Sequence, residues 1–335
     1  MGRTARDDGL SMPAEWEPHE RTLIAWPERE ATWRDTSIEA ARAVHAEVVA
    51  AVAAFEPVTL VASPAEADDA RSRVPADNVE VVALPIDDSW LRDNGPIVIA
   101  DGSARAGVDF AFNAWGEAFT PYDRDAAVAA LLLDHLGLPR RPVDLVLEGG
   151  SIAVDGGGRL VTTEQCLLNP NRNPDMTRAE IEARLAGDLG LTRVLWLGDG
   201  LANDHTDGHV DNLARFVGAN RLALPVAAGE DDPNAAIFAD AKARAEAMGV
   251  EVVSIPSPGR VTNEEGDVVP ASYMNFYIGN AAVVVPVYGS ANDDAAVAAI
   301  GALFPGRAAV GVRADHLLTG GGSLHCISQQ IPSAG

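Results

Sequence analysis

One cysteine near the C-terminal end of the chain raises the first chemical question. Cys326 lies in "GGGSLHCISQQIP" (320–332), directly after three glycines and a histidine and at the start of a predicted strand. A free cysteine in such a place is most often a small buried hydrophobic residue. The alternative is a nucleophile held at the mouth of a pocket. The other polar residues of the chain favour this second interpretation.

Three carboxylates and an imidazole stand at the ends of other apolar segments. Asp93 lies in "WLRDNGP", Glu148 in "LEGGS", and His209 and Asp211 in "DGHVDN". If the last segment is extended, its histidine and aspartate project from the same face. Taken singly, each residue has an ordinary structural interpretation, such as a turn cap, an edge charge or a structural histidine. With Cys326 they make a set of three acids, one imidazole and one thiol.

This set fits a planar cationic substrate better than its alternatives. A cysteine–histidine pair indicates covalent catalysis, but a papain-like protease has no use for three acids. A metal site of His209, Asp211 and Glu148 is a further alternative. Carboxylates and a thiol would combine hard and soft ligands, and the spacing of these residues matches no familiar metal motif. A guanidinium presents five N–H donors in a fork that carboxylates bind in bidentate fashion. Carboxylates would hold its electrophilic carbon before the sulfur, and its positive charge would favour the thiolate.

The elements that must position these residues alternate between helix and strand. Helical periodicity or composition predicts helices over 36–55, 123–136, 177–189, 233–248 and 291–304, and short apolar strands over 58–63, 143–148, 193–198, 250–255 and 308–313. Polar residues recur after these units, roughly 60 residues apart, as a weak internal repeat: Asp93, Glu148, His209, Asn275 and Cys326. A ring of strand–helix units would bring them to one centre, although a doubly wound sheet also places loops at strand ends.

Composition narrows the class of protein. The 335 residues include 25 Lys and Arg against 49 Asp and Glu, a formal net charge of −24. Such a chain repels nucleic acid and attracts small cations. It has no apolar run long enough for a membrane helix and no signal peptide, so we expect a soluble cytoplasmic protein that acts neither on membranes nor on nucleic acid. Two cysteines make neither a disulfide scaffold nor a cysteine-type zinc site.

Seven stretches, in order along nearly the whole chain, resemble the agmatine deiminases and bacterial peptidylarginine deiminase-like enzymes of the guanidine-modifying pentein superfamily. They are "MPAEWEPHERTLIAWPER" (12–29), "LPIDDSWLRDNGP" (84–96), "FNAWG" (112–116), "LEGGSI" (147–152), "TDGHVDNLARFV" (206–217), "SYMNFYIGN" (272–280) and "GGGSLHCISQQIP" (320–332). The resemblance implies a single catalytic domain over residues 1–335, an α/β fold of five propeller blades around one central active site.

The resemblance also implies a role for each residue of the set. Cys326 is the expected nucleophile and His209 the general acid and base, while Glu148 and Asp211 hold the guanidinium and Asp93 binds its far edge. The residues expected to contact the rest of the substrate are Trp90, Asp87, Trp26, Asp204 and Gly322. No metal or organic cofactor is expected.

Two positions depart from the family pattern, and the sequence leaves the substrate tail open. His205 stands where an acidic residue is expected and Ser323 where an asparagine is expected. Both bear on substrate identity more than on the reaction. Glu15 and Glu17 lie in a matched stretch, but the sequence does not decide which acid receives a distal ammonium.

The predicted reaction is hydrolysis of agmatine, a small cationic guanidine, to N-carbamoylputrescine and ammonia through a covalent amidino adduct. A deiminase of peptidyl-arginine or another guanidine, an amidinotransferase and a non-catalytic cation-binding module are the alternatives. Cys166 is interpreted as structural because no histidine lies next to it in the sequence. His325 is expected to point away from Cys326 if the segment is a strand. Homo-oligomerisation stays open.

Overall fold

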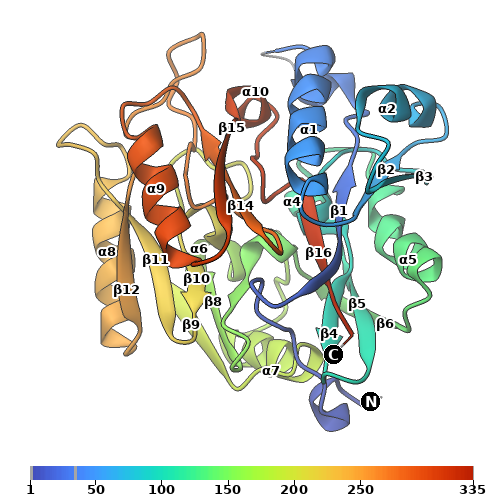
Figure 1. Ribbon diagram of the computed structural model, residues 1–335. Coiled ribbons are helices and arrows are strands. Elements are labelled where there is room, and N and C mark those ends of the chain that lie inside the picture. Colours follow the sequence, from blue (N-terminus) through green and yellow to red (C-terminus); the bar gives the residue numbers. More distant parts are fainter. Residues whose placement is uncertain (1–2, 34–35, 335) are drawn as a thin grey trace.

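Five small mixed sheets follow one another around the molecule (Figure 1). The computed structural model describes residues 3–33 and 36–334. In each sheet one neighbouring pair of strands is antiparallel and the next pair is parallel, with a helix inserted before the parallel strand. The predicted five-bladed α/β propeller is confirmed.

Four of the five units run in chain order from hairpin to helix to strand. They are β4 (Ile97–Ala100), β5 (Arg105–Ala111), α5 (Asp125–Leu136) and β6 (Arg140–Val146); β7 (Ala153–Val154), β8 (Arg159–Thr163), α7 (Arg178–Asp188) and β9 (Arg193–Leu197); β10 (Arg215–Gly218), β11 (Arg221–Val226), α8 (Ala235–Ala247) and β12 (Glu251–Pro256); and β13 (Tyr277–Ile278), β14 (Ala282–Val287), α9 (Asp293–Leu303) and β15 (Ala308–Arg313).

The fifth unit closes the ring by joining the two ends of the chain. The last strand, β16 (Ser328–Pro332), pairs antiparallel with the first, β1 (His19–Ala25). After β1 come α1 (Ile38–Ala53), the parallel strand β2 (Val58–Ala62), α2 (Ala67–Arg73) and β3 (Val79–Ala83). The pairing therefore makes Cys326, just before β16, part of the same unit as the N-terminal strand.

The predicted helices begin and end within about two residues of their expected bounds, and side-chain caps fix the start of two of them. Ser37 accepts a hydrogen bond from the Ala40 N–H at the start of α1. Thr177 and Glu180 form a capping box at the start of α7. On α1 the predicted apolar stripe is buried through Val44, Val48 and Val52. The propeller core lies where such stripes pack on the sheets.

Further short helices, outside the predicted set, lie within the units or in the segments that connect them. They are α3 (Leu91–Asn94), α4 (Ala114–Glu117), α6 (Glu164–Leu167), α10 (Asp315–Leu318) and the 3₁₀ turns η1 (Arg6–Asp8), η2 (Glu30–Trp33), η3 (Gly149–Ser151) and η4 (Val210–Asn212). Among them, α3 packs against η3, and η3 against η4. These contacts join the polar segments of three successive units.

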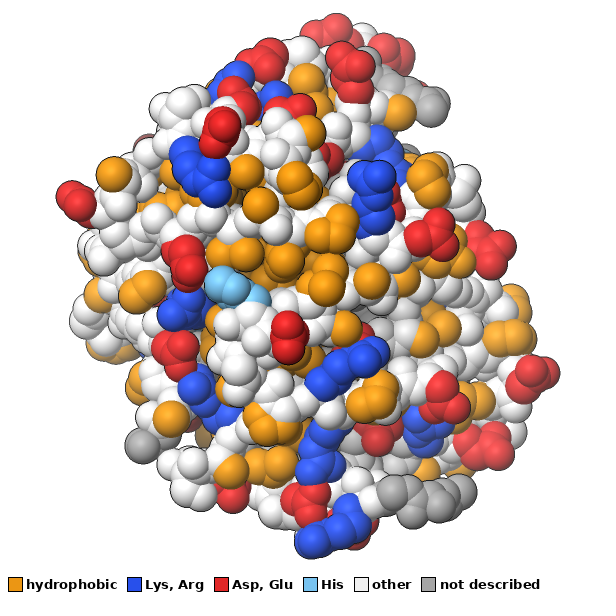
Figure 2. Space-filling model, turned by 90° about the vertical axis from the view of Figure 1, so that its right-hand side faces the viewer, with side chains coloured by type: hydrophobic (Ala, Val, Ile, Leu, Met, Phe, Trp, Pro, Cys, Tyr) orange, Lys and Arg blue, Asp and Glu red, His pale blue; other side chains and the backbone are white. Residues whose placement is uncertain are grey.

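The surface distributes its charge without a single dominant patch on the side that Figure 2 shows. Acidic and basic side chains alternate there with small apolar areas. No helix in the described ranges is long and apolar enough to cross a membrane.

Candidate active site

The sequence-predicted set meets around one glycine. Gly150, in η3, has no side chain, and a Cβ built there would lie 2.6 Å from His209 Nδ1, 2.8 Å from Asp93 Oδ1 and 3.1 Å from Asp211 Oδ2. Glu148 stands two residues earlier, directly after β6. The glycine thus leaves open a space that the histidine and two of the acids share.

Two local predictions about these residues are wrong. The segment with His209 and Asp211 is not extended, because Val210–Asn212 form the 3₁₀ turn η4. Cys326 is not in a strand, because residues 324–327 form turns and β16 begins at Ser328. Consequently His325 does not point away from the site. Its Nδ1 lies 2.8 Å from Asp211 Oδ2, the oxygen that also lies 3.7 Å from Cys326 Sγ.

Each of the three buried carboxylates is held by a specific donor. Asp93 accepts hydrogen bonds from the Gly150 N–H at 2.9 Å and from Trp115 Nε1 at 3.0 Å. Glu148 Oε1 accepts from Arg172 Nε at 2.6 Å. The remaining oxygens, Glu148 Oε2 and Asp211 Oδ1, are buried and have no hydrogen-bond partner within the described part of the chain. Two fixed carboxylates therefore each present a free acceptor.

Burial and mutual repulsion set the charges of these acids. Burial raises the pKa of Asp93 well above the usual carboxyl range, and the charges of Asp211 and Glu148 raise it further. Burial also raises the pKa of Glu148, although Arg172 opposes it. For Asp211 burial acts in the same direction, but the hydrogen bond and charge of His325, together with His209 and Arg215, outweigh it and lower the pKa. The cluster is thus poised to gain stabilisation from a bound cation.

His209 is a neutral, fully buried imidazole. Burial lowers its pKa to about 3. Neither ring nitrogen has a hydrogen-bond partner among the residues described, and Nδ1 lies 3.7 Å from Asp93 Oδ1. A neutral imidazole with both nitrogens unengaged is available to take and return a proton.

Cys326 is fixed by Asn275 and is protonated in the absence of a cation. Asn275 Nδ2 lies 3.2 Å from the sulfur, and Asn275 Oδ1 accepts from the Cys326 N–H at 3.3 Å and from the His325 N–H at 2.9 Å. Burial, then the charges of Asp211 and Asp93, raise the thiol pKa well above its usual value. The sulfur needs a positive charge beside it to ionise.

A narrow pocket leads from the surface to Asp93 and Cys326. Trp90 packs on Trp33 with ring centroids 5.7 Å apart, and Trp115 packs edge-on against Phe119. A Cβ at Gly322 would lie 2.4 Å from the Trp90 ring, so this glycine lets the indole stand against the cysteine loop. The lining residues are Thr32, Asp88, Trp90, Asp93, Trp115, Phe119, His205, Thr206, Gly320, Gly321, Gly322 and Cys326.

Of the residues expected to contact the substrate, Trp90 and Gly322 line this pocket and three others do not. Trp26 is fully buried in the core and its Nε1 donates to Asp69. Asp87 accepts a hydrogen bond from the Arg124 N–H, at the start of α5. Asp204 accepts from Thr206 N–H and Oγ1 and so shapes the loop. Their sequence neighbours Asp88, His205 and Thr206 line the pocket instead.

Neither N-terminal glutamate reaches the pocket. Glu15 is buried behind the site, where Arg215 and His325 bind it. Glu17 is exposed and lies near the end of the chain, beside Pro332. Ser323 is buried and contacts the Tyr288 hydroxyl at 3.3 Å, so this departure from the family pattern affects the cysteine loop. His205 lies at the mouth and faces any substrate tail.

Four residues that the structure places at the candidate site have no predicted role from the sequence. Asn275 was recognised only as a repeat marker, and Arg172, Trp115 and Asp88 were not assigned. "FNAWG" and "CLLNPNR" carried a signal, since each places a donor in a polar stretch after a strand. Trp115 also adopts a positive φ of 57°, which is unusual for a bulky residue and marks a constrained position.

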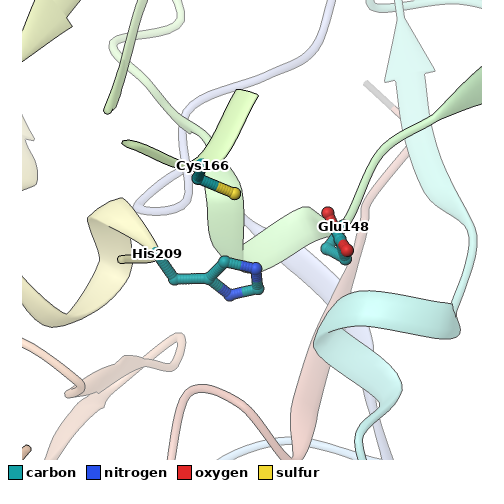
Figure 3. Close-up of side chains that lie close together, drawn as sticks. All are labelled: Glu148, Cys166 and His209. Carbon is teal, nitrogen blue, oxygen red and sulfur yellow. The ribbon is translucent and has the colours of Figure 1, made fainter. Parts of the chain in front are cut away.

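Cys166 lies beside the catalytic set although no histidine is near it in the sequence. Its sulfur, an oxygen of Glu148 and a ring nitrogen of His209 all lie within 4.8 Å of one another. Figure 3 shows the three side chains pointing toward a common space from α6, from the end of β6 and from the loop before η4.

The chain is similar over nearly its whole length to proteins of a known family. The model of the Porphyromonas-type peptidyl-arginine deiminase family matches residues 11–332. An agmatine deiminase of Pseudomonas aeruginosa is 42% identical over 98% of this chain and 97% of its own. The structure of Enterococcus faecalis agmatine deiminase superposes with a TM-score of 0.95 at 34% identity, covering 100% of this chain and 99% of that one.

A C. jejuni agmatine deiminase, solved as a cysteine-to-serine variant with substrate bound, gives a TM-score of 0.89 at 30% identity and covers 97% of this chain and 96% of its own. These similarities extend over every unit of the ring. The chain therefore belongs to the agmatine deiminase and Porphyromonas-type peptidyl-arginine deiminase family of the pentein superfamily.

Proposed function

We propose that this protein is an agmatine deiminase, a hydrolase that converts agmatine and water to N-carbamoylputrescine and ammonia. One observation carries the proposal. Two buried carboxylate oxygens, Glu148 Oε2 and Asp211 Oδ1, and both nitrogens of His209 lack partners in the described ranges, beside a fixed thiol. A guanidinium supplies the N–H donors and the positive charge that such a set lacks.

Substrate binding activates the nucleophile. The bound cation offsets the charges of Asp211 and Asp93 that raise the thiol pKa, so the Cys326 proton passes to His209 and the sulfur attacks the guanidinium carbon. His209 then protonates one amino nitrogen, which leaves as ammonia. The product of this half-reaction is a planar, cationic S-linked amidino adduct, which Glu148 and Asp211 still hold.

Water completes the reaction at the same carbon. His209, again neutral, takes a proton from the attacking water, the C–S bond breaks, and this proton returns to the sulfur. The remaining positive charge of the adduct leaves as a proton to solvent as the neutral ureido product forms. Asp93 keeps its orientation throughout because Gly150 and Trp115 hold its two oxygens. Each step uses only groups of this chain, the guanidine and water.

The distal ammonium of agmatine is assigned to Asp88. This residue lines the pocket, and Thr32 and the Ser89 N–H fix its carboxylate. Burial raises its pKa to about 6, so it is mostly ionised at neutral pH. The narrow aromatic walls suit the four methylenes between the two charges of agmatine.

The test is a substrate panel of agmatine, free arginine and a peptidyl-arginine, with ureido product and ammonia both quantified for the wild type and Cys326→Ala. We expect stoichiometric ammonia and ureido product from agmatine, abolished in the variant. Turnover of another guanidine in preference to agmatine would keep the chemistry and change the substrate. Amidino transfer to an added amine without a ureido product would contradict hydrolysis.

A further inference from the structure

Cys166 completes a ligand set that the deiminase mechanism does not use as a whole. Its sulfur joins Glu148 and His209 in a group whose three ligand atoms lie within 4.8 Å of one another, and all three residues are buried. Two of the three have unpartnered polar atoms within the described chain, namely Glu148 Oε2 and both His209 nitrogens. Figure 3 shows these side chains converging.

Local hydrogen bonds fix this convergence. Cys166 lies in the first turn of α6, which Thr163 caps by accepting from the Cys166 N–H at 3.2 Å. Thr163 also donates to the Gly208 carbonyl at 2.7 Å, directly before His209. Glu148 is anchored through its other oxygen by Arg172. The thiol and the imidazole therefore come from two segments that share one bridging residue.

We propose that Glu148, Cys166 and His209 form an inhibitory binding site for Zn²⁺, separate from the nucleophile Cys326. Zn²⁺ binds thiolate, imidazole and carboxylate, whereas Mg²⁺ and Ca²⁺ favour oxygen ligands alone, so the thiolate and the imidazole select Zn²⁺. Tetrahedral Zn²⁺ with bonds of about 2.0–2.3 Å brings ligand atoms to roughly 3.5 Å from one another. Side-chain rotations that move the ligand atoms by about an ångström would bring them from within 4.8 Å of one another to this spacing. Water occupies the fourth position.

The electrostatics of the region favour a divalent cation. Glu148, Asp93 and Asp211 meet there and Asp207 lies near, and Arg172 pairs with Glu148 and Asp207. On binding, the Cys166 thiol gives its proton to solvent and a Zn–S bond forms, with no change of oxidation state. The metal then holds the histidine lone pair and the carboxylate oxygen that the deiminase needs, so it competes with the guanidine. This inhibition rests on the proposed function, whereas the binding does not.

The binding test uses the fact that the chain has only two cysteines. In Cys326→Ser protein, Cys166 is the sole thiol, and Co²⁺ serves as the spectroscopic probe for Zn²⁺. We expect a thiolate-to-Co²⁺ charge-transfer band and tetrahedral visible bands that saturate near one equivalent and are displaced by Zn²⁺ but not by Mg²⁺. Adding Cys166→Ser must abolish the charge-transfer band, and adding His209→Gln must weaken Co²⁺ binding at least tenfold.

A Cys326→Ser protein without the thiolate band, or with a band unaffected by His209→Gln, would overturn the site. The activity arm compares wild type with Cys166→Ser and Cys166→Ala, which should keep turnover. We expect Zn²⁺ to inhibit wild type competitively and reversibly with EDTA, and the inhibition constant to rise at least tenfold in both variants. A Zn²⁺ inhibition constant that stayed unchanged in both Cys166 variants would place the inhibitory metal at Cys326 instead. If no guanidine were turned over, the proposed function would fail while the Co²⁺ spectra would still decide the metal site.

Discussion

Cys326 is the residue whose chemistry depends most on what binds beside it. Burial and two carboxylates keep its thiol protonated, while Asn275 keeps the sulfur in place. Reactivity is therefore conditional on a cation that also presents an electrophilic carbon. An exposed low-pKa thiol would react with any electrophile, whereas this arrangement restricts attack to guanidine-like molecules.

The first prediction concerns this conditional reactivity. A haloacetamidine, which carries a planar cation, should alkylate Cys326 faster than the neutral haloacetamide of the same size, by about tenfold or more at pH 7. The amidinium offsets the charges of Asp211 and Asp93 that raise the thiol pKa. Mass spectrometry of the labelled peptide measures both rates.

As a control, the same two reagents are applied to the free thiol of glutathione, where their alkylation rates should differ much less. Reaction of both reagents with Cys326 at the same rate would mean that the thiol is ionised before any cation binds. Protection by agmatine would show that labelling takes place in the pocket.

The second prediction concerns the pocket mouth. Asp88→Asn should raise the KM for agmatine several-fold, and hardly change it for butylguanidine, which lacks the ammonium. Because the Asp88 pKa is raised to about 6, the agmatine KM of the wild type should also fall as pH rises through 6, as the carboxylate ionises. Steady-state kinetics from pH 5 to 8 with both substrates measure this.

His205→Glu is the opposing variant at the same mouth. It places a carboxylate where the family pattern expects one, and exposed ion pairs contribute roughly 0.2–1 kcal/mol, so kcat/KM for agmatine should rise by up to about fivefold. If Asp88→Asn raised the KM for agmatine and for butylguanidine equally, the Asp88 carboxylate would maintain the structure of the mouth rather than bind the ammonium.

At the scale of elements, the short turns between units place the chemistry. α3, η3 and η4 each carry a reactive residue or leave room for one, and they pack on one another at the centre. In η3, a Cβ added to Gly150 would meet His209, Asp93 and Asp211, so this glycine keeps open the space that the three side chains share.

The third prediction follows from that geometry. Gly150→Ala should lower kcat/KM by about 100-fold or more, because displacing catalytic groups by an ångström is enough for such a loss. The backbone tolerates the change, since Gly150 is not in the left-handed region. Gly157→Ala is the matched control in the neighbouring hairpin, where the new Cβ meets nothing closer than 3.4 Å. Similar activity of both variants would contradict the assigned site.

The sequence predicted the long elements because their signals are local. The helices of all five units and the strands after them have caps or apolar patterns of their own, as Thr177 and Glu180 illustrate. The turn geometry had no such signal. Whether His325 faces Asp211 depends on where β16 begins, and Cys166 meets His209 only through the Thr163 bridge. Asn275 could be predicted as one residue of the internal repeat. Its hydrogen bond to Cys326 joins two different units of the ring, and no local pattern predicts such a contact.

The fourth prediction concerns α5 and the loop that carries the mouth. Asp125 Oδ1 accepts from the N–H groups of Asp87 and Asp88, and burial raises the Asp125 pKa to about 7. The folded protein thus holds a proton that the unfolded chain releases near pH 4, so this group stabilises the fold less as pH rises from about 4 to 7. Asp125→Asn keeps the acceptor oxygen and removes the charge.

Relative to wild type, Asp125→Asn should therefore gain stability between pH 5 and pH 8, by up to about 2.7 kcal/mol, because about two pKa units of the shift fall within this range at roughly 1.4 kcal/mol per unit. Urea midpoints of both proteins at the two pH values measure the difference. Parallel pH profiles of the two proteins would show that the carboxyl group titrates normally.

At the scale of the whole molecule, ring closure makes the central site a product of both chain ends. β16 follows Cys326 and pairs with β1, and Glu15, before β1, reaches His325 behind the site. His325 in turn contacts Asp211. The ring therefore links its closing pair to Asp211, whose Oδ2 lies 3.7 Å from Cys326 Sγ, and no single unit contains the whole candidate site.

The last prediction uses the net charge of −24, which attracts cations to the molecule. Agmatine carries two positive charges and butylguanidine one, so their attraction differs while their chemistry is the same. Salt screens this attraction over about 10 Å at 0.1 M. Raising ionic strength from about 10 mM to 0.5 M should lower kcat/KM for agmatine several-fold, with roughly half the logarithmic slope for butylguanidine. Because the proposed mechanism uses Cys326 and His209 for both substrates, a salt effect on these groups would give equal slopes, whereas steering by the field of the molecule requires the dication to respond more.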